Sequence, residues 1–173
     1  MSDVIDGAII KSLLSYDPDT GVLTWINPAA NHRELIGREA GWINSAGYRE
    51  VRVLGRMYRA HRLAWLWMTG EWPAFHIDHA NRVRSDNRWS NLRDATRLQQ
   101  LGNTGPRSTN KGGHRGVYYF GGRNRRKSKP WRAVIVANGK RRYLGYFDTV
   151  EEAATAYDTA AREVYGEFYA TDR

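Results

Sequence analysis

Asp78 and His79 are adjacent residues in a short apolar run that follows a proline. A polar loop rich in Asn and Arg covers residues 81–91, and a short strand-like piece covers residues 92–95. A helix is predicted to begin near Thr96. An oxygen ligand and an imidazole at the end of a strand, facing a short helix across a loop, suit hydrolysis of a phosphodiester at one metal ion.

Two other histidines compete with this interpretation. By strand alternation His76 shares a face with Asp78, which leaves a His76–Asp78 metal site as an alternative. His61 stands before a Trp-rich apolar helix predicted over residues 61–68. It is interpreted as a structural histidine rather than a metal ligand.

The order of these parts resembles the ββα-metal motif of the HNH endonucleases. The resemblance rests on the Asp78-His79 pair, the twelve-residue step to Asn91 in an Asn-Leu turn, and the capped helix that follows. It implies that His79 is the general base that takes a proton from the attacking water, with an unperturbed pKa of about 6.5. It also implies that Asp78 binds Mg²⁺ or Mn²⁺, while the Asn91 amide braces the loop and orients the imidazole.

The third position of the HNH motif departs from the family. It falls nine residues after Asn91, where the family usually has Asn or His and this chain has Gln100. Gln keeps an amide oxygen but is one methylene longer, so its reach differs and its ordering costs more entropy. Three outcomes stay open: Gln100 binds the metal after a slight retreat of the helix, Asn103 takes its place, or the site binds metal poorly.

Charge is distributed unevenly along a chain whose net charge is +9. Residues 105–147 carry 12 Lys or Arg and no Asp or Glu, whereas residues 148–173 have a net charge of −5. A long block without an acidic residue indicates a polyanionic partner. Double-stranded DNA is the partner expected.

The composition also limits the class of protein. The absence of Cys excludes disulfides, thiolate zinc sites and a Cys nucleophile. The sequence has no signal-peptide pattern and no run of about 18 apolar residues, so a soluble cytoplasmic protein is expected.

The predicted fold class is α+β with two domains. An HNH nuclease domain over residues 1–103 has a β-rich lobe and a ββα-metal core at about 74–103. A basic Gly- and Ser-containing linker follows at residues 104–112. Residues 113–173 are predicted to form a three-stranded antiparallel sheet packed on one helix, with a hairpin turn at Asn138-Gly139. A capping box at Thr149 opens the helix.

This second domain resembles the Apetala-two/ethylene-response-factor DNA-binding domain. The resemblance rests on RGVYYF and on WRAVIVANGKRRYLGYFDTVEEAATAYDTAAREVYGEF. It implies that the sheet enters the major groove of DNA, and six sheet positions match positions that contact bases or backbone in that family: Arg115, Tyr118, Trp131, Arg132, Arg142 and Tyr143. Val134, Val136, Leu144 and Phe147 are expected to be buried under the helix.

Basic side chains outside these six positions complete the predicted DNA-binding set. Some surround the Asp-His pair, and others follow the basic turn of the second domain or its third strand. They are Arg82, Arg84, Arg93, Arg97, Arg123, Arg125, Arg126 and Arg141.

The two resemblances together predict a metal-dependent DNA endonuclease of the homing type, encoded by a phage and acting in the cytoplasm of a bacterial host. No protein partner is implied, and a monomer with one active site would nick one strand. The main alternative is a catalytically inactive DNA-binding protein that keeps the HNH fold, which Gln100 favours. An RNA-binding module is a weaker alternative, because the second resemblance is to DNA-binding domains.

Overall fold

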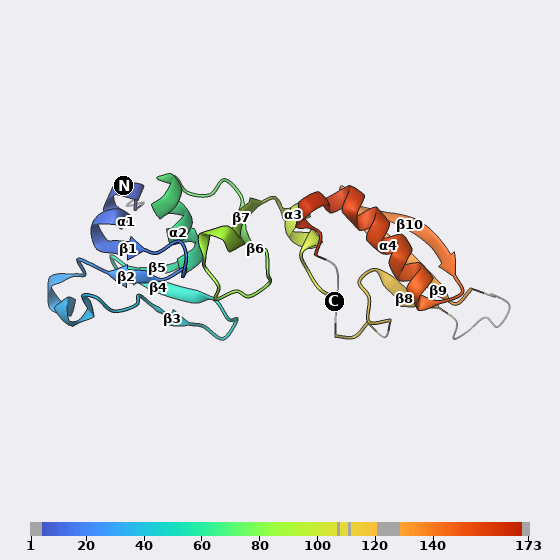
Figure 1. The fold of residues 1–173 in the computed structure, drawn as a ribbon, viewed down its shortest axis with the longest axis horizontal. Helices are drawn as coiled ribbons and strands as arrows, with labels where there is room; N and C mark the ends of the chain where they lie inside the picture. Colours follow the sequence, from blue (N-terminus) through green and yellow to red (C-terminus); the bar gives the residue numbers. More distant parts are fainter. Residues whose placement is uncertain (1–4, 107, 111, 121–128, 171–173) are drawn as a thin grey trace. The chain divides into compact units, whose positions relative to one another are not determined.

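The computed structural model describes residues 5–106, 108–110, 112–120 and 129–170. It is an α+β fold with several small antiparallel sheets, as the sequence predicts (Figure 1). The chain divides into two compact units, Met1–Ala95 and Thr96–Arg173. Within the described residues, no helix is long and apolar enough to cross a membrane.

In the part of unit 1 that the structure describes, helices alternate with three small antiparallel sheets. Its elements in chain order are α1 (Gly7–Leu13), β1 (Leu14–Tyr16), β2 (Leu23–Trp25), the 3-10 helix η1 (Ala30–Leu35), β3 (Trp42–Ile43), β4 (Arg49–Val53), β5 (Arg56–Arg59), α2 (Ala60–Thr69), β6 (His76–His79), η2 (Trp89–Asn91) and β7 (Leu92–Ala95). Strand β1 pairs with β2, β4 lies between β3 and β5, and β6 pairs with β7.

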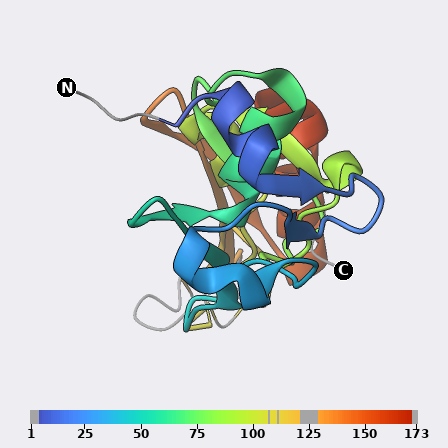
Figure 2. The same cartoon turned by 90° about the vertical axis from the view of Figure 1, so that its left-hand side faces the viewer.

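The core of unit 1 lies between α1, α2 and the β3–β5 sheet. Val51 and Val53 alternate on β4 and are fully buried, as are Leu63 and Ile10 on the two helices. Helix α1 lies against α2 (Figure 2). The contact is close at its start: a Cβ on Gly7 would lie 2.8 Å from the Cα of Gly70, so only glycine fits there.

Unit 2 is a three-stranded antiparallel sheet with helices. Its elements are α3 (Arg97–Gly102), β8 (Val117–Tyr119), β9 (Trp131–Ala137), β10 (Lys140–Phe147), α4 (Val150–Tyr165) and the 3-10 helix η3 (Gly166–Phe168). Strand β9 is central, and α4 packs against all three strands on one face (Figure 1). Asn138 and Gly139 have φ of 51° and 74°, as the predicted type I′ turn requires.

The sheet face under α4 differs from the expectation for β9. Val134 and Val136 were expected to be buried there, but Ala133 and Ile135 are the buried residues and Val136 is 38% exposed. Both alternating sets of β9 are apolar, so alternation alone does not select the inner face. Small residues on α4 allow the helix to approach the inner set closely, and its buried face includes Ala153, Ala154, Tyr157, Ala160 and Ala161. Leu144 and Phe147 pack against this core as expected.

Helix α3 belongs to unit 2. Unit 1 ends at Ala95, eight residues before the predicted end of the first domain at residue 103. Leu98 packs against the core of unit 2, and a Cβ on Gly102 would lie 2.7 Å from the Cβ of Tyr165. The Thr96 hydroxyl accepts from the Gln99 N–H, and the Gln99 side chain accepts from the Thr96 N–H. This capping box fixes the start of the helix at the unit boundary.

Candidate active site

The Asp78-His79 pair lies at the end of β6, in a two-stranded hairpin with β7. In the register of this hairpin, Asp78 is opposite Arg93 and His79 is opposite Leu92. Both members of the pair are buried, with 9% of Asp78 and 5% of His79 exposed. The hairpin therefore fixes the backbone of both residues, and the loop of residues 80–91 contacts His79 through Asn87.

Asp78 is ion-paired across the hairpin. The Nε and Nη2 of Arg93 donate to its Oδ2 at 2.9 Å and 2.8 Å. Arg93 is one of the side chains predicted to contact DNA, and here its guanidinium neutralises the predicted metal ligand instead. A divalent ion at this oxygen would compete with the guanidinium, because both need the same lone pairs.

The Asp78 carboxylate is the kind of hard oxygen donor that Mg²⁺ or Mn²⁺ prefers. Among the described residues, no three His, Asp or Glu side chains gather where they could hold a metal ion together. A divalent ion at Asp78 would therefore take its other ligands from amide oxygens, water and a substrate phosphate. Such a mixed shell is usual for Mg²⁺.

The imidazole of His79 is held by Asn87. Its Nε2 lies 3.3 Å from the Oδ1 of Asn87, whose Nδ2 donates to the Ser85 carbonyl. An amide oxygen only accepts, so Nε2 carries the proton and Nδ1 has the lone pair that a general base needs. Burial lowers the pKa of His79, against the opposing effects of Asn87 and two nearby carboxylates. The ring is therefore neutral at neutral pH, the form that accepts a proton.

The Asn91 side chain braces the loop by bonding to two of its backbone groups. Its Oδ1 accepts from the Asn81 N–H at 2.9 Å and its Nδ2 donates to the Asp86 carbonyl at 2.8 Å. The Asn91 carbonyl also accepts from the Ala80 N–H. The imidazole forms a hydrogen bond with Asn87 instead, which the sequence did not single out because nothing in its spacing distinguishes it from the other Asn residues of the loop.

Two rings from distant parts of unit 1 lie beside His79, the predicted general base. His61, at the start of α2, meets His79 edge to face with ring centroids 5.0 Å apart. Tyr48 lies 5.5 Å from His61 and 6.0 Å from His79. Burial lowers the pKa of His61 to about 3, so this ring is neutral beside His79. His61, which the sequence predicts to be structural, packs on the His79 ring.

Gln100 and Asn103, the candidates for the third metal position, lie in unit 2. Gln100 is half-buried on α3, and Asn103 caps the helix, with 6% of the residue exposed. Asp78 belongs to unit 1. A metal shell shared between Asp78 and either amide therefore stays a prediction.

The remaining arginines predicted around the site are exposed. Arg82 has a φ of +64° in the loop, and Arg97 lies in the first turn of α3 in unit 2. Arg84 donates to the Ala46 carbonyl at 2.9 Å, and its guanidinium lies 5.1 Å from the Tyr48 ring. In unit 1, Arg82 and Arg84 are thus presented at the loop, and phosphate contact by them stays a prediction.

In unit 2 the register separates the predicted DNA contacts between the two faces of the sheet. Tyr118 is opposite Arg132, Tyr143 is opposite Val134 and Arg141 is opposite Val136. Cross-strand partners share a face. Tyr118, Arg132, Arg141 and Tyr143 therefore lie on the face that α4 does not cover.

Three other side chains that were predicted to contact DNA form contacts within unit 2. Arg115 donates to the Gly102 and Thr104 carbonyls and to the Tyr165 hydroxyl. Arg142 is opposite Ile135 on the α4 side and donates to Glu163 at 3.2 Å. Trp131 is half-buried and packs against the core below α4. These three were predicted to contact DNA because they match positions of the Apetala-two family, and such a match does not report what each side chain contacts here. Arg123, Arg125 and Arg126 lie outside the described residues.

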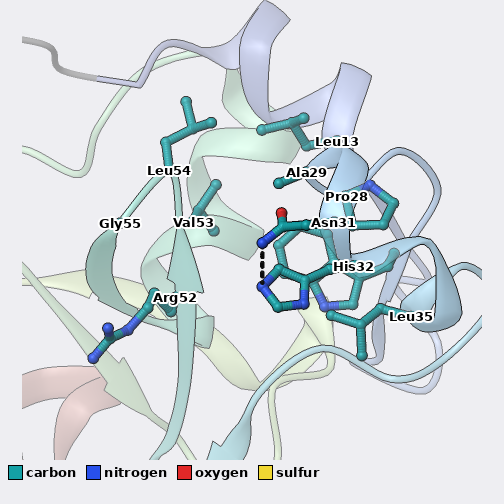
Figure 3. A pocket seen from close by; sticks show the side chains of 11 residues that line it. Leu13, Pro28, Ala29, Asn31, His32, Leu35, Arg52, Val53, Leu54 and Gly55 are labelled. Atoms are coloured by element: carbon teal, nitrogen blue, oxygen red, sulfur yellow. Dashed lines mark hydrogen bonds between the residues drawn. The ribbon is translucent and has the colours of Figure 1, made fainter.

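Unit 1 also has an apolar hollow outside this site. It has a volume of about 370 Å³ and lies between η1 and the β4–β5 turn (Figure 3). Trp25, Leu35 and Leu54 line it, and Asn31 and His32 contact each other at its edge. It contains none of the predicted site residues.

Comparison with known proteins supports the assignment of the hairpin. Residues 58–101 match the family model described as HNH endonuclease, from the end of β5 to α3. Over 172 residues the chain is 27% identical to the "Uncharacterized HNH endonuclease L560" of Acanthamoeba polyphaga mimivirus, covering 98% of this chain and 84% of the viral protein. No solved structure matches. Residues 58–101 are therefore similar to the HNH endonucleases, as expected; the Apetala-two resemblance of residues 113–173 stays a prediction.

Proposed function

We propose that the protein is a metal-dependent DNA endonuclease of the homing type. His79 acts as the general base, Asp78 holds one divalent ion, and unit 2 binds double-stranded DNA. The observation that carries the proposal is the arrangement at the end of β6. There a neutral imidazole with its Nε2 on Asn87 stands next to a carboxylate, inside the segment that matches the HNH endonucleases.

The protein's own groups divide the work of hydrolysis. Asn87 and the packed rings hold the His79 imidazole so that Nδ1 takes a proton from the attacking water. Asp78 would hold Mg²⁺ or Mn²⁺, with Gln100 or Asn103 as the further protein ligand. When bound, the ion stabilises the negative charge that develops on the leaving 3′ oxygen and its phosphate. The products would carry a 3′-hydroxyl and a 5′-phosphate.

Two features of unit 2 support its role as the DNA-binding part. Residues 105–147 have no acidic side chain. The sheet of unit 2 is covered by α4 on one face and leaves Arg132 and Arg141 on the other. A positively charged sheet of this kind favours a nucleic-acid partner. A monomer with one active site would nick one strand of the duplex.

A second candidate function is DNA binding without cleavage. Two observations favour it: Gln100 replaces the usual third ligand, and Arg93 already neutralises Asp78. Either would weaken metal binding, and both leave the fold intact.

Incubation of supercoiled plasmid carrying the viral or host genome region with Mg²⁺ or EDTA separates the two candidates. Wild type, His79→Ala and Gln100→Asn are compared, with His76→Ala as a matched control on the same strand. Metal-dependent relaxation by wild type and His76→Ala, lost in His79→Ala, supports the nuclease. Cleavage by Gln100→Asn alone identifies a nuclease disabled at its third ligand. Tight binding without cleavage by any variant leaves a DNA-binding protein, and loss of cleavage in His76→Ala points to the His76–Asp78 alternative.

A further inference from the structure

The open face of the sheet of unit 2 consists mainly of apolar and aromatic side chains. It consists of seven strand residues that share the face opposite α4, together with Phe120: Tyr118, Arg132, Val134, Val136, Arg141, Tyr143, Tyr146 and Phe120. Tyr118, Phe120 and Tyr143 are 47%, 49% and 63% exposed. An exposed apolar surface of this kind on a small unit marks an interaction site.

Arg132 lies at the centre of this face and supports the rings. Its guanidinium is 5.9 Å from the Tyr118 ring, 5.1 Å from the Phe120 ring and 5.7 Å from the Tyr143 ring. Among the described residues, the buried Nε of Arg132 has no hydrogen-bond acceptor. A guanidinium committed to three rings is poorly placed to form the bidentate bond with which arginine reads guanine. Among the described strand residues of this face, Arg141 is the other side chain that could form such a contact.

We propose that the open face recognises thymine methyl groups by apolar contact. The proposal rests on the proposed function of unit 2 as the DNA-binding part. The major groove admits β-strands, and the thymine C5-methyl is the apolar group that base edges present there. Tyr118, Val136 and Tyr143 supply the matching surface. With no acid in residues 105–147, the phosphates on either side of the groove meet no repulsion.

The arrangement of the rings disfavours the stacking of single-stranded bases. A stacking surface presents separate aromatic rings to successive bases. Here three rings converge on one guanidinium, and Phe120 also meets Tyr146 edge to face at 6.4 Å. Such rings form one clustered apolar surface, which suits contact with methyl groups better than stacking along a strand.

The test begins with selection of bound sequences from a random duplex library by the full chain in EDTA, which prevents cleavage. A selected duplex is then made with thymine and with deoxyuridine in its place. The two probes have the same charge and the same hydrogen-bonding groups, and differ in the methyl groups. We expect a thymine-containing core and an affinity loss of about fourfold for each contacted methyl group in the deoxyuridine probe.

Adjacent tyrosines provide matched variants. Tyr118→Ala removes a ring from the open face, whereas Tyr119→Ala removes an equally exposed ring from the other face, opposite Trp131. Tyr118→Ala should bind the two probes more equally, and Tyr119→Ala should discriminate between them as wild type does. Val136→Ala repeats the test with a smaller change, and thermal unfolding checks that each variant folds.

The outcomes separate this inference from the function on which it rests. Absence of duplex binding overturns both. Duplex binding with equal affinity for the two probes overturns the methyl contact alone. Two other results would also overturn the methyl contact alone. One is a selected core rich in guanine that Arg141→Ala no longer binds, and the other is a preference for single-stranded DNA.

Discussion

The imidazoles of His61 and His79 meet edge to face, with centroids 5.0 Å apart and ring planes at 81°. His61 comes from the first turn of α2 and His79 from the end of β6, so this contact ties the largest helix of unit 1 to the candidate base. Asn87 holds His79 by hydrogen bonding, and His61 holds it by packing. Together they define the orientation of the ring.

Replacement of His61 by alanine should slow cleavage by misorienting His79. Loss of the packed ring leaves space beside the imidazole, and a misplacement of about 1 Å costs up to about a hundredfold in rate. We expect kcat to fall while KM changes little, because the substitution leaves the proposed DNA-binding surface of unit 2 unchanged. His61→Phe keeps a ring at the contact and should restore much of the rate. Single-turnover cleavage of a bound duplex measures this, with His32→Ala as the control. Equal rates in wild type and His61→Ala would contradict it.

His61 should also make unit 1 sensitive to acid. Its folded-state pKa of about 3 is below the value of about 6.5 for an unfolded histidine. Between these values the unfolded chain binds a proton that the folded chain excludes. Stability is therefore complete above about pH 6.5 and falls as the pH drops toward 3, by up to about 1.4 kcal/mol per pH unit. Urea unfolding at about pH 7 and about pH 5 should show a smaller loss in His61→Phe than in wild type. An unchanged loss would mean that other groups cause it.

Removal of Arg93 should couple the stability of unit 1 to divalent ions. Arg93→Ala leaves the buried Asp78 carboxylate without its guanidinium, which costs about 1–3 kcal/mol. It also removes the cation that competes with a metal at Oδ2. Mg²⁺ should therefore raise the Tm of Arg93→Ala more than that of wild type. Arg93→Ala with Asp78→Asn is the control, since the ion has then lost its carboxylate. Equal Mg²⁺ shifts in wild type and Arg93→Ala would place the ion elsewhere.

Local signals predicted the elements of unit 2 well. The Asn138-Gly139 turn needs two positive φ angles, and those two residue types adopt them most easily. The Thr149 hydroxyl caps α4 as its position before Glu152 indicates. The prediction of which face of β9 points inward was wrong: Val134 and Val136 were expected to be buried, but Ala133 and Ile135 are. Val134 and Ile135 are equally apolar, so alternation carries no information there.

The candidate site was predictable where it depends on local spacing. Asp78, His79 and Asn91 lie within one hairpin and its loop, so their spacing in the sequence also determines how they are placed relative to one another. His61 and Asn87 contact the same imidazole through the packing of α2 and through the path of the loop, and neither leaves a pattern in the sequence. Long-range contacts of this kind need the structure.

Asn91 should control the order of the loop rather than the chemistry. Asn91→Ala removes the acceptor of the Asn81 N–H and the donor to the Asp86 carbonyl, and should cost about 1–3 kcal/mol. Asn91→Asp keeps the acceptor and loses the donor, so its effect should be intermediate. Hydrogen exchange at the Asn81 amide measures the change directly. Protection equal to wild type in Asn91→Ala would show that the loop is held by other bonds.

Arg141 and Arg142 are neighbours in sequence on opposite faces of β10, and they should differ in DNA binding. Arg142 faces Glu163 on α4 in an exposed pair, so Arg142→Ala should change stability by less than about 1 kcal/mol. It should leave DNA affinity nearly intact. Arg141 lies on the open face, opposite Val136. Arg141→Ala should weaken binding and reduce the dependence of log K on log salt by about one if it contacts a phosphate. Affinity measured across a salt series tests both, and a larger loss in Arg142→Ala would mean that the α4 side of the sheet faces DNA.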